Sequence, residues 1–142
     1  MTIHFRVFGN PIPQPRQRHT MKIAADGRFV QWNYTPSKHP VKPWKLSVQL
    51  VARAECAAPL EGPLVLDVTF LLPRPKAMRW KRKAMSREWW PHKPDTDNLV
   101  KALKDAVKGI LWIDDSQVVM VVARKLLAGQ EEPGAIVQVT PA

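Results

Sequence analysis

A single strand-forming run sets the main limit on the fold. Residues Leu64–Leu72 (LVLDVTFLL) are dominated by β-branched and large apolar side chains, which predicts a strand. Gly62 and Pro63 stand immediately before this run and separate it from the upstream segment. Apolar patterns predict three more strands, at residues 2–8, 117–127 and 135–140. The core is therefore expected to be built on a sheet.

Two helices are predicted between these strands. One spans residues 43–57 and opens on a proline near its first turn, and the other spans residues 98–108 and ends at Gly109. A short hairpin around Asp26–Gly27 is expected within an otherwise irregular stretch. The order β-α-β-α-β-β predicts an α+β fold of two layers, in which helices pack on one mixed sheet. The length of 142 residues predicts one domain, residues 1–142.

The charge of the chain points to a polyanionic partner. Lys and Arg number 22 against 12 Asp and Glu, which gives a formal net charge of +10. Eight of the basic residues lie within one short segment whose only acid is Glu88: Arg74, Lys76, Arg79, Lys81, Arg82, Lys83, Arg87 and Lys93. Trp80, Trp89 and Trp90 are interleaved with them and suit stacking on bases. A solubilising loop is the alternative, and nucleic-acid contact is the interpretation favoured here.

Two aspartates follow this basic segment at once, in PHKPDTDNLVKALKDAV. A helical wheel of residues 98–108 places Leu99, Leu103, Ala106 and Ile110 on one side, with Asp97, Lys101, Lys104, Asp105 and Lys108 on the other. Asp97 is suited to cap the helix, and Lys101 is spaced to pair with Asp97 and Asp105. Capping does not account for Asp95, because a second carboxylate beside the first repels it unless a cation neutralises both.

A second acidic pair lies between the helix and the next predicted strand, at Asp114 and Asp115, after Trp112, which is expected to fill the core. A strand paired beside Leu64–Leu72 would bring one of the two near Asp95; a polar turn is the alternative. Carboxylates are the ligands that Mg²⁺ takes in proteins, and a bound metal polarises a phosphodiester and activates water. Lys101 would stabilise the charge that develops on phosphorus. Acids would then hold the ion while the basic segment holds the polymer.

These motifs, from Asp95, Asp97 and Asn98 through Lys101 and Asp105 to Trp112, Asp114 and Asp115, resemble the RusA family of Holliday junction resolvases, endodeoxyribonucleases common in prophages. The resemblance implies that Asp95, Asp97 and Asp115 bind Mg²⁺, with Mn²⁺ as a substitute, and that Lys101 takes part in cleavage. It further implies a homodimer that resolves four-way DNA junctions by symmetric nicks in recombination and repair. The loop after the first strand resembles a family loop, so Arg16 and Arg18 are assigned to DNA phosphate, together with Arg79, Lys81, Arg82, Lys83, Arg87 and Lys93.

Two other functions remain open at this point: a non-catalytic basic DNA-binding protein, and a phosphodiesterase for small nucleotides. The four histidines lack zinc-site spacing, and no nucleotide-binding glycine motif is present, so no small-molecule cofactor is expected. Cys56 is the single cysteine, which excludes an internal disulfide and favours a reducing compartment. Without a signal peptide or membrane-length apolar run, a cytoplasmic protein is expected.

Overall fold

The computed structural model describes residues 2–15, 18–34 and 36–142, with only the backbone described at 18–20 and 32–34. Five strands form one sheet in the order β1-β7-β4-β6-β5. In chain order the strands are β1 (Ile3–Phe8), β4 (Leu64–Leu72), β5 (Glu88–Trp89), β6 (Val118–Leu127) and β7 (Gly134–Pro141). The helices are α1 (Val41–Glu55) and α2 (Thr96–Val107). Two short 3-10 turns, η1 (Lys76–Met78) and η2 (Asp115–Gln117), lie before β5 and β6.

The predicted α+β class with a mixed sheet is confirmed. β4 and β6 are parallel neighbours, whereas β1, β4 and β5 pair antiparallel with β7 or β6. Every predicted strand and helix is present, with ends that differ from prediction by one or two residues. The two-residue strand β5 was not predicted, because its pairing with Leu126 and Leu127 depends on tertiary contact and has no local pattern.

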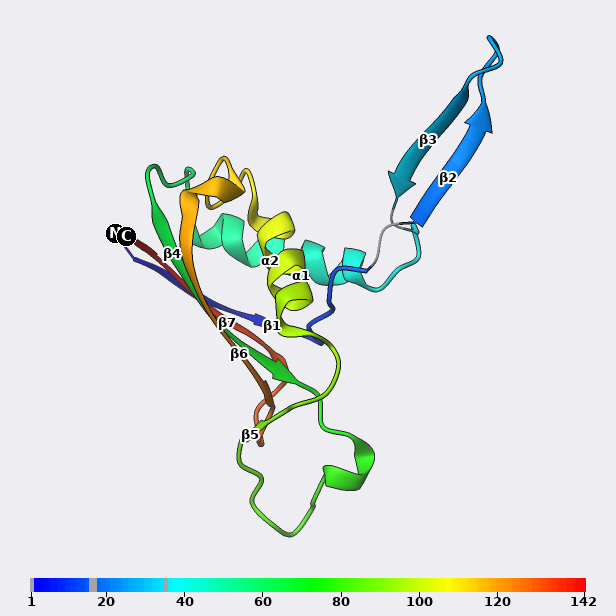
Figure 1. The fold of residues 1–142 in the computed structure, drawn as a ribbon. Coiled ribbons are helices and arrows are strands. Elements are labelled where there is room, and N and C mark those ends of the chain that lie inside the picture. The colour runs from blue at the N-terminus through cyan, green and yellow to red at the C-terminus, as the bar shows by residue number, and fades with distance from the viewer. Residues whose placement is uncertain (1, 16–17, 35) are drawn as a thin grey trace.

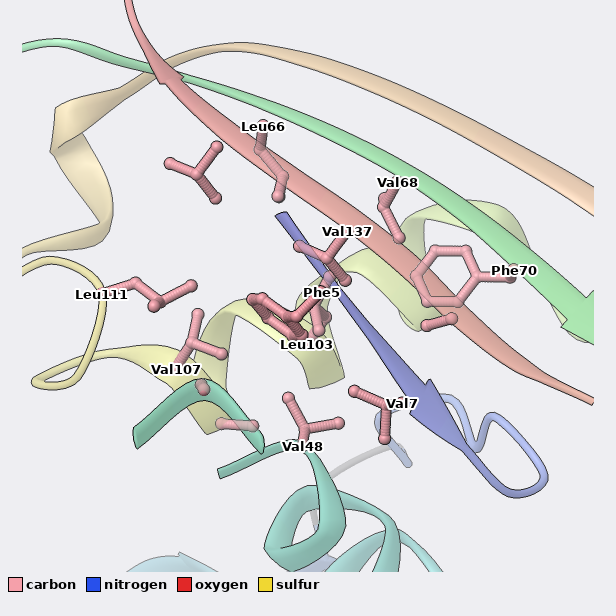
Figure 2. Close-up of a cluster of buried hydrophobic side chains, with 14 of the residues drawn as sticks. Phe5, Val7, Val48, Leu66, Val68, Phe70, Leu103, Val107, Leu111 and Val137 are labelled. Atoms are coloured by element: carbon pink, nitrogen blue, oxygen red, sulfur yellow. The ribbon is translucent and has the colours of Figure 1, made fainter. Parts of the chain in front are cut away.

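Both helices cover the same face of the sheet and enclose the core there (Figure 1). On β4 the side chains of Leu64, Leu66, Val68 and Phe70 are fully buried, while those between them are half-buried, as expected for a sheet with one covered face. Figure 2 shows Phe5, Val48, Leu103 and Val137 among the side chains that fill this layer. Trp112 is also fully buried, as predicted.

Gly134 allows β1 and β7 to approach closely. It lies opposite Phe8 in the β1–β7 register, and a Cβ atom there would be 2.0 Å from the carbonyl oxygen of Val7. Any other residue would have to displace the backbone of β1 at this point.

The hairpin predicted around Asp26–Gly27 is confirmed. It consists of β2 (Arg18–Ile23) and β3 (Phe29–Tyr34), which form a separate two-stranded sheet that projects from the body (Figure 1). Gly27 has φ +83°, a conformation that glycine adopts readily, and the amide of Arg28 donates to Asp26 Oδ1 at 3.1 Å.

Within the described ranges, no helix is both long enough and apolar enough to cross a membrane.

Candidate functional site

The first of the two aspartates before α2 occupies the N-cap position. Asp95 has extended backbone angles (φ −71°, ψ 140°), and its carbonyl accepts the amide of Leu99 at 3.2 Å. The prediction that Asp97 caps the helix was wrong: Asp97 lies in the first turn. The apolar pattern locates the first buried residue, Leu99, whereas the helix begins three residues earlier. The Asp95 side chain makes no capping hydrogen bond, so its carboxylate is available to another partner.

The polar face of α2 presents two groups without an ion-pair partner. Asp97 and Lys101 are exposed, and within the described residues neither lies within 4.0 Å of an opposite charge. The predicted pairing of Lys101 with Asp97 and Asp105 is therefore wrong. Asp105 pairs instead with Lys45 of α1, at 3.9 Å.

Lys45 is the residue beside the site that the sequence did not reveal. Burial against α2 lowers the pKa of its ammonium, Asp105 opposes this shift, and the nearby Lys101 and Lys42 add to it. Its position depends on how α1 packs against α2, and helical periodicity within α1 carries no signal of that packing.

Asp114 and Asp115 have different tasks. The Asp114 carboxylate caps η2 by accepting the amide of Ser116 at 2.9 Å, which lowers the pKa of Asp114. Asp115 Oδ1 instead accepts the indole N–H of Trp112 at 2.8 Å. Because Trp112 is fully buried in the core, this bond fixes the Asp115 carboxylate relative to the sheet.

Gln117 anchors the same turn to the chain before β4. Its side-chain oxygen accepts the amides of Ile113 and Asp114, and its side-chain nitrogen donates to the carbonyls of Leu60 and Gly62 at 2.9 and 3.1 Å. The turn that carries Asp115 is therefore held at both ends.

Six residues from α2 and η2 line one cavity of about 280 Å³: Asp97, Val100, Lys101, Lys104, Asp105 and Asp115. The structure thus brings together Asp97, Lys101 and Asp115, three of the four predicted catalytic residues. Asp95 lines two neighbouring cavities, one with Lys93 and Asn98 and one with Trp89, Arg124 and Lys125. Among the described residues, no three His, Cys, Asp or Glu side chains converge closely enough to hold one metal ion.

The stretch that leads to Asp95 is tied to the sheet by Lys125 of β6. Its ammonium donates to the carbonyl oxygens of His92 and of Pro94, the second at 2.6 Å. On the other side, the amide of Gln14 donates to the Asn98 carbonyl at 2.9 Å, so the segment after β1 packs against the first turn of α2. The start of α2 is therefore held from two directions.

Arg74 organises the basic segment. It is the one charged side chain that is buried in the described part of the chain. Its guanidinium donates to the carbonyls of Ala128 (2.7 Å), Met78 (3.2 Å) and Ser86. It also lies over the ring of Trp80, 5.3 Å from the centroid. Arg74, which the sequence analysis grouped with the other basic residues, therefore holds the loop together.

The remaining basic residues of the segment differ in whether their side chains already have a partner. Arg87 is paired with Glu131 at 2.5 Å, and Arg79 donates to the carbonyl of Arg74. Lys83 lies over the Trp80 ring. Lys81, Arg82 and Lys93 are exposed, and their side chains make no hydrogen bond or ion pair within the described residues. Arg16 lies outside the described residues, and Arg18 is described only as backbone.

The three tryptophans of the segment are not equivalent. Trp90 packs against the core and donates to the carbonyl of Lys93 at 3.0 Å, and Trp80 carries cations on its ring. Trp89 is 71% exposed and lies in the same cavity as Asp95. Among the three, Trp89 is therefore the ring best placed to stack on a base.

A cavity lined by three aspartates, in a chain with a strongly basic loop, is typical of proteins that act on polyanions. The chain matches the family model described as Endodeoxyribonuclease RusA over residues 9–140, and it belongs to this family. It is 35% identical over 139 residues to the Uncharacterized protein YqaN of Bacillus subtilis (strain 168), a match that covers 92% of this chain and 90% of the relative. The protein is therefore a nuclease of an endodeoxyribonuclease family, and DNA is its partner.

The role of Arg74 can be tested by the substitution Arg74→Lys. A lysine cannot donate to three separated carbonyls as a guanidinium does, so we expect the loop at residues 76–87 to open more often. Trypsin should then cut after Lys81 to Lys83 at least several-fold faster than in the unsubstituted protein. Arg87→Lys, which changes only the ion pair with the half-buried Glu131, is the matched control. Equal cleavage rates for the two variants would contradict the role assigned to Arg74.

Proposed function

We propose that this protein is a Mg²⁺-dependent, structure-selective endodeoxyribonuclease. It resolves Holliday junctions by paired symmetric nicks, as a homodimer, in DNA recombination and repair. The observation that carries the proposal is that Asp97, Lys101 and Asp115 share one cavity, in a chain of the RusA family that also carries a strongly basic loop.

The donor set suits Mg²⁺. Asp97 makes no ion pair among the described residues, the Asp95 side chain makes no capping bond, and Asp115 is held through Oδ1, which leaves Oδ2 free. Mg²⁺ is usually bound in proteins by one or two carboxylates, with waters and substrate phosphates completing its shell. Asp97 and Asp115 would supply such a pair, whereas Asp95 lines the neighbouring cavities and does not converge with them. When bound, the ion would polarise the phosphodiester and lower the pKa of an attacking water.

The other residues of the cavity have roles that follow from their charge and position. Lys101 is exposed and unpaired, so its ammonium is free to approach a phosphate oxygen as negative charge builds there. Trp112 acts through Asp115 as a positioning residue, because its buried N–H holds one carboxylate oxygen. The Lys45 ammonium pairs with Asp105 and offsets its negative charge, which limits the repulsion among the carboxylates of the cavity.

The basic loop would hold the DNA backbone on the side of the site where Trp89 and Asp95 line one cavity. Lys81 and Arg82 are exposed at its tip, and each contact of such a residue with a phosphate releases counterions. Trp89 stands between the loop and Asp95, where a base could stack on its exposed ring.

Metal-dependent cleavage is tested with Asp97→Asn. We expect junction binding to persist while the nicking rate with Mg²⁺ falls by roughly 10²–10³-fold, as for the loss of one electrostatic stabiliser of a transition state. Labelled four-way junctions, linear duplex and single strands provide the measurement, with and without Mg²⁺. Glu55→Gln, an exposed carboxylate at the end of α1, is the control. Binding of junctions with no cleavage by the unsubstituted protein under any metal condition would instead identify a non-catalytic DNA-binding protein.

The two adjacent aspartates provide a sharper comparison. Asp115→Asn should reduce nicking by a similar factor, because it removes a ligand charge while keeping the indole hydrogen bond. Asp114→Asn should leave the nicking rate within a few-fold of the unsubstituted protein, since asparagine also caps a helical turn. Nicking rates at saturating Mg²⁺ are the measurement. A reversed order would place Asp114, not Asp115, in the ligand set.

Salt dependence separates free from paired arginines in the loop. Arg82→Ala should reduce the slope of log affinity against log salt by about one unit, because an exposed side chain that contacts phosphate is lost. Arg87→Ala should change the slope less, since Glu131 already neutralises this residue. Junction affinity measured by fluorescence anisotropy over a range of salt would show the difference. Equal slopes for Arg82→Ala and the unsubstituted protein would exclude Arg82 from the phosphate contacts.

A further inference from the structure

We propose that the outer edge of β6 is the dimer interface: it pairs antiparallel with β6 of a second copy, about a two-fold axis near Val121. The two five-stranded sheets would then form one continuous sheet. The inference deepens the proposed function, which includes a homodimer, but it rests on the edge itself and is tested through assembly.

Among the residues that the structure describes, no strand pairs with most of the outer edge of β6. On its inner side β6 pairs with β4 along its whole length, from Val118 to Leu127. On its outer side β5 pairs only with Leu126 and Leu127, and the amide of Trp90 donates to the carbonyl of Lys125. In the part of the chain that the structure describes, no strand pairs with residues 118–124 on this side. A row of free backbone donors and acceptors of this kind is a template for another strand.

The side chains of this edge are apolar, whereas edge strands that remain unpaired usually carry charged side chains. Val119, Met120 and Val121 are 62%, 56% and 42% exposed. The run at residues 118–123 (VVMVVA) contains no charge and no proline, which are the usual protections of an exposed edge. The opposite edge strand, β1, carries His4 and Arg6 instead. A long apolar edge is therefore expected to be covered in the working protein.

A second copy of the same strand fits this edge in length and direction. The unpaired stretch is bounded by η2 at one end and by β5 at the other, which places its centre at Val121. Two identical edge strands related by a two-fold axis necessarily run antiparallel. The Val118 end of β6 in one copy then lies beside the far end of β6 in the other copy.

The charges at the two ends are complementary in this arrangement. Asp114 and Asp115 stand just before β6, whereas Arg124, which also pairs with Asp67 at 2.8 Å, and Lys125, which donates only to backbone carbonyls, stand near its end. Antiparallel pairing brings the acidic end of one copy beside the basic end of the other. Opposite charges across an interface fix its register and disfavour other partners.

The same symmetry orients the two candidate sites. The two-fold axis of an antiparallel strand pair is perpendicular to the sheet, so the helices of both copies lie on one side of the joined sheet. Both cavities containing Asp97 and Asp115 then face the same side. A substrate with two opposed scissile strands requires such an arrangement.

The interface is tested by the oligomeric state of edge variants. Light scattering after size-exclusion chromatography should give a dimer for the full chain. Met120→Lys and Val121→Lys each place a charge on the edge and should weaken dimerisation at least tenfold. Leu50→Lys is the matched control, because Leu50 is 60% exposed but lies on α1. A monomeric unsubstituted chain, or edge variants that dimerise as well as Leu50→Lys does, would overturn the proposal.

Single cysteines provide a test that does not disturb folding. In a Cys56→Ser background, Met120→Cys, Val121→Cys and Val122→Cys are oxidised one at a time. A residue at the axis faces its own copy with Cβ atoms about 4.5–5.5 Å apart, close enough for a disulfide. At least one of the three should give a covalent dimer, and Leu50→Cys should not; no covalent dimer from any of them would exclude the pairing. A dimer that cannot cut junctions would leave this interface standing and remove the nuclease proposal.

Discussion

The parallel pairing of β4 and β6 is the constraint on which the candidate site depends. Parallel neighbours need a crossover, and α2 with its flanking segments supplies it. The helix must therefore run back along the sheet, so that η2 returns beside its polar face. Asp97 lies in the first turn of this helix, where it faces the returning η2, whereas Asp95 occupies the N-cap position before the turn. This geometry explains why Asp97 and Asp115 share a cavity while Asp95 faces the next one.

A hydrogen bond then couples the hydrophobic core to this cavity. Trp112 is fully buried, and a buried N–H left without an acceptor costs about 1–3 kcal/mol. Asp115 is its acceptor, so folding itself favours the position of the Asp115 carboxylate. Asp114, one residue earlier, stabilises the local turn through Ser116. Asp114 thus stabilises the turn, whereas Asp115 lines the cavity. The buried Trp112 accounts for this difference, because it bonds to Asp115.

The sequence predicted the elements well because their signals are local. Leu64–Leu72 and the amphipathic α2 are marked by the spacing of their own apolar residues, and Asp26–Gly27 marked a hairpin. What failed or was missed depends on contacts between distant segments. Lys45 pairs with Asp105 because α1 packs on α2. Arg74 is buried because the loop folds around it. The family motif directed attention to Asp115, but only the indole of Trp112 distinguishes it physically from Asp114.

Hydrogen bonds to the sheet hold the basic loop and the acidic residues of the candidate site in separate places. A net charge of +10 attracts polyanions to the surface but does not by itself orient them. Arg74 closes the basic loop onto Ala128, the residue that follows β6, and Lys125 ties the chain before Asp95 to β6. The loop and the chain before Asp95 are thus both fixed to β6. On the proposed function, a phosphate backbone held by the loop would therefore lie at a set distance from the carboxylates.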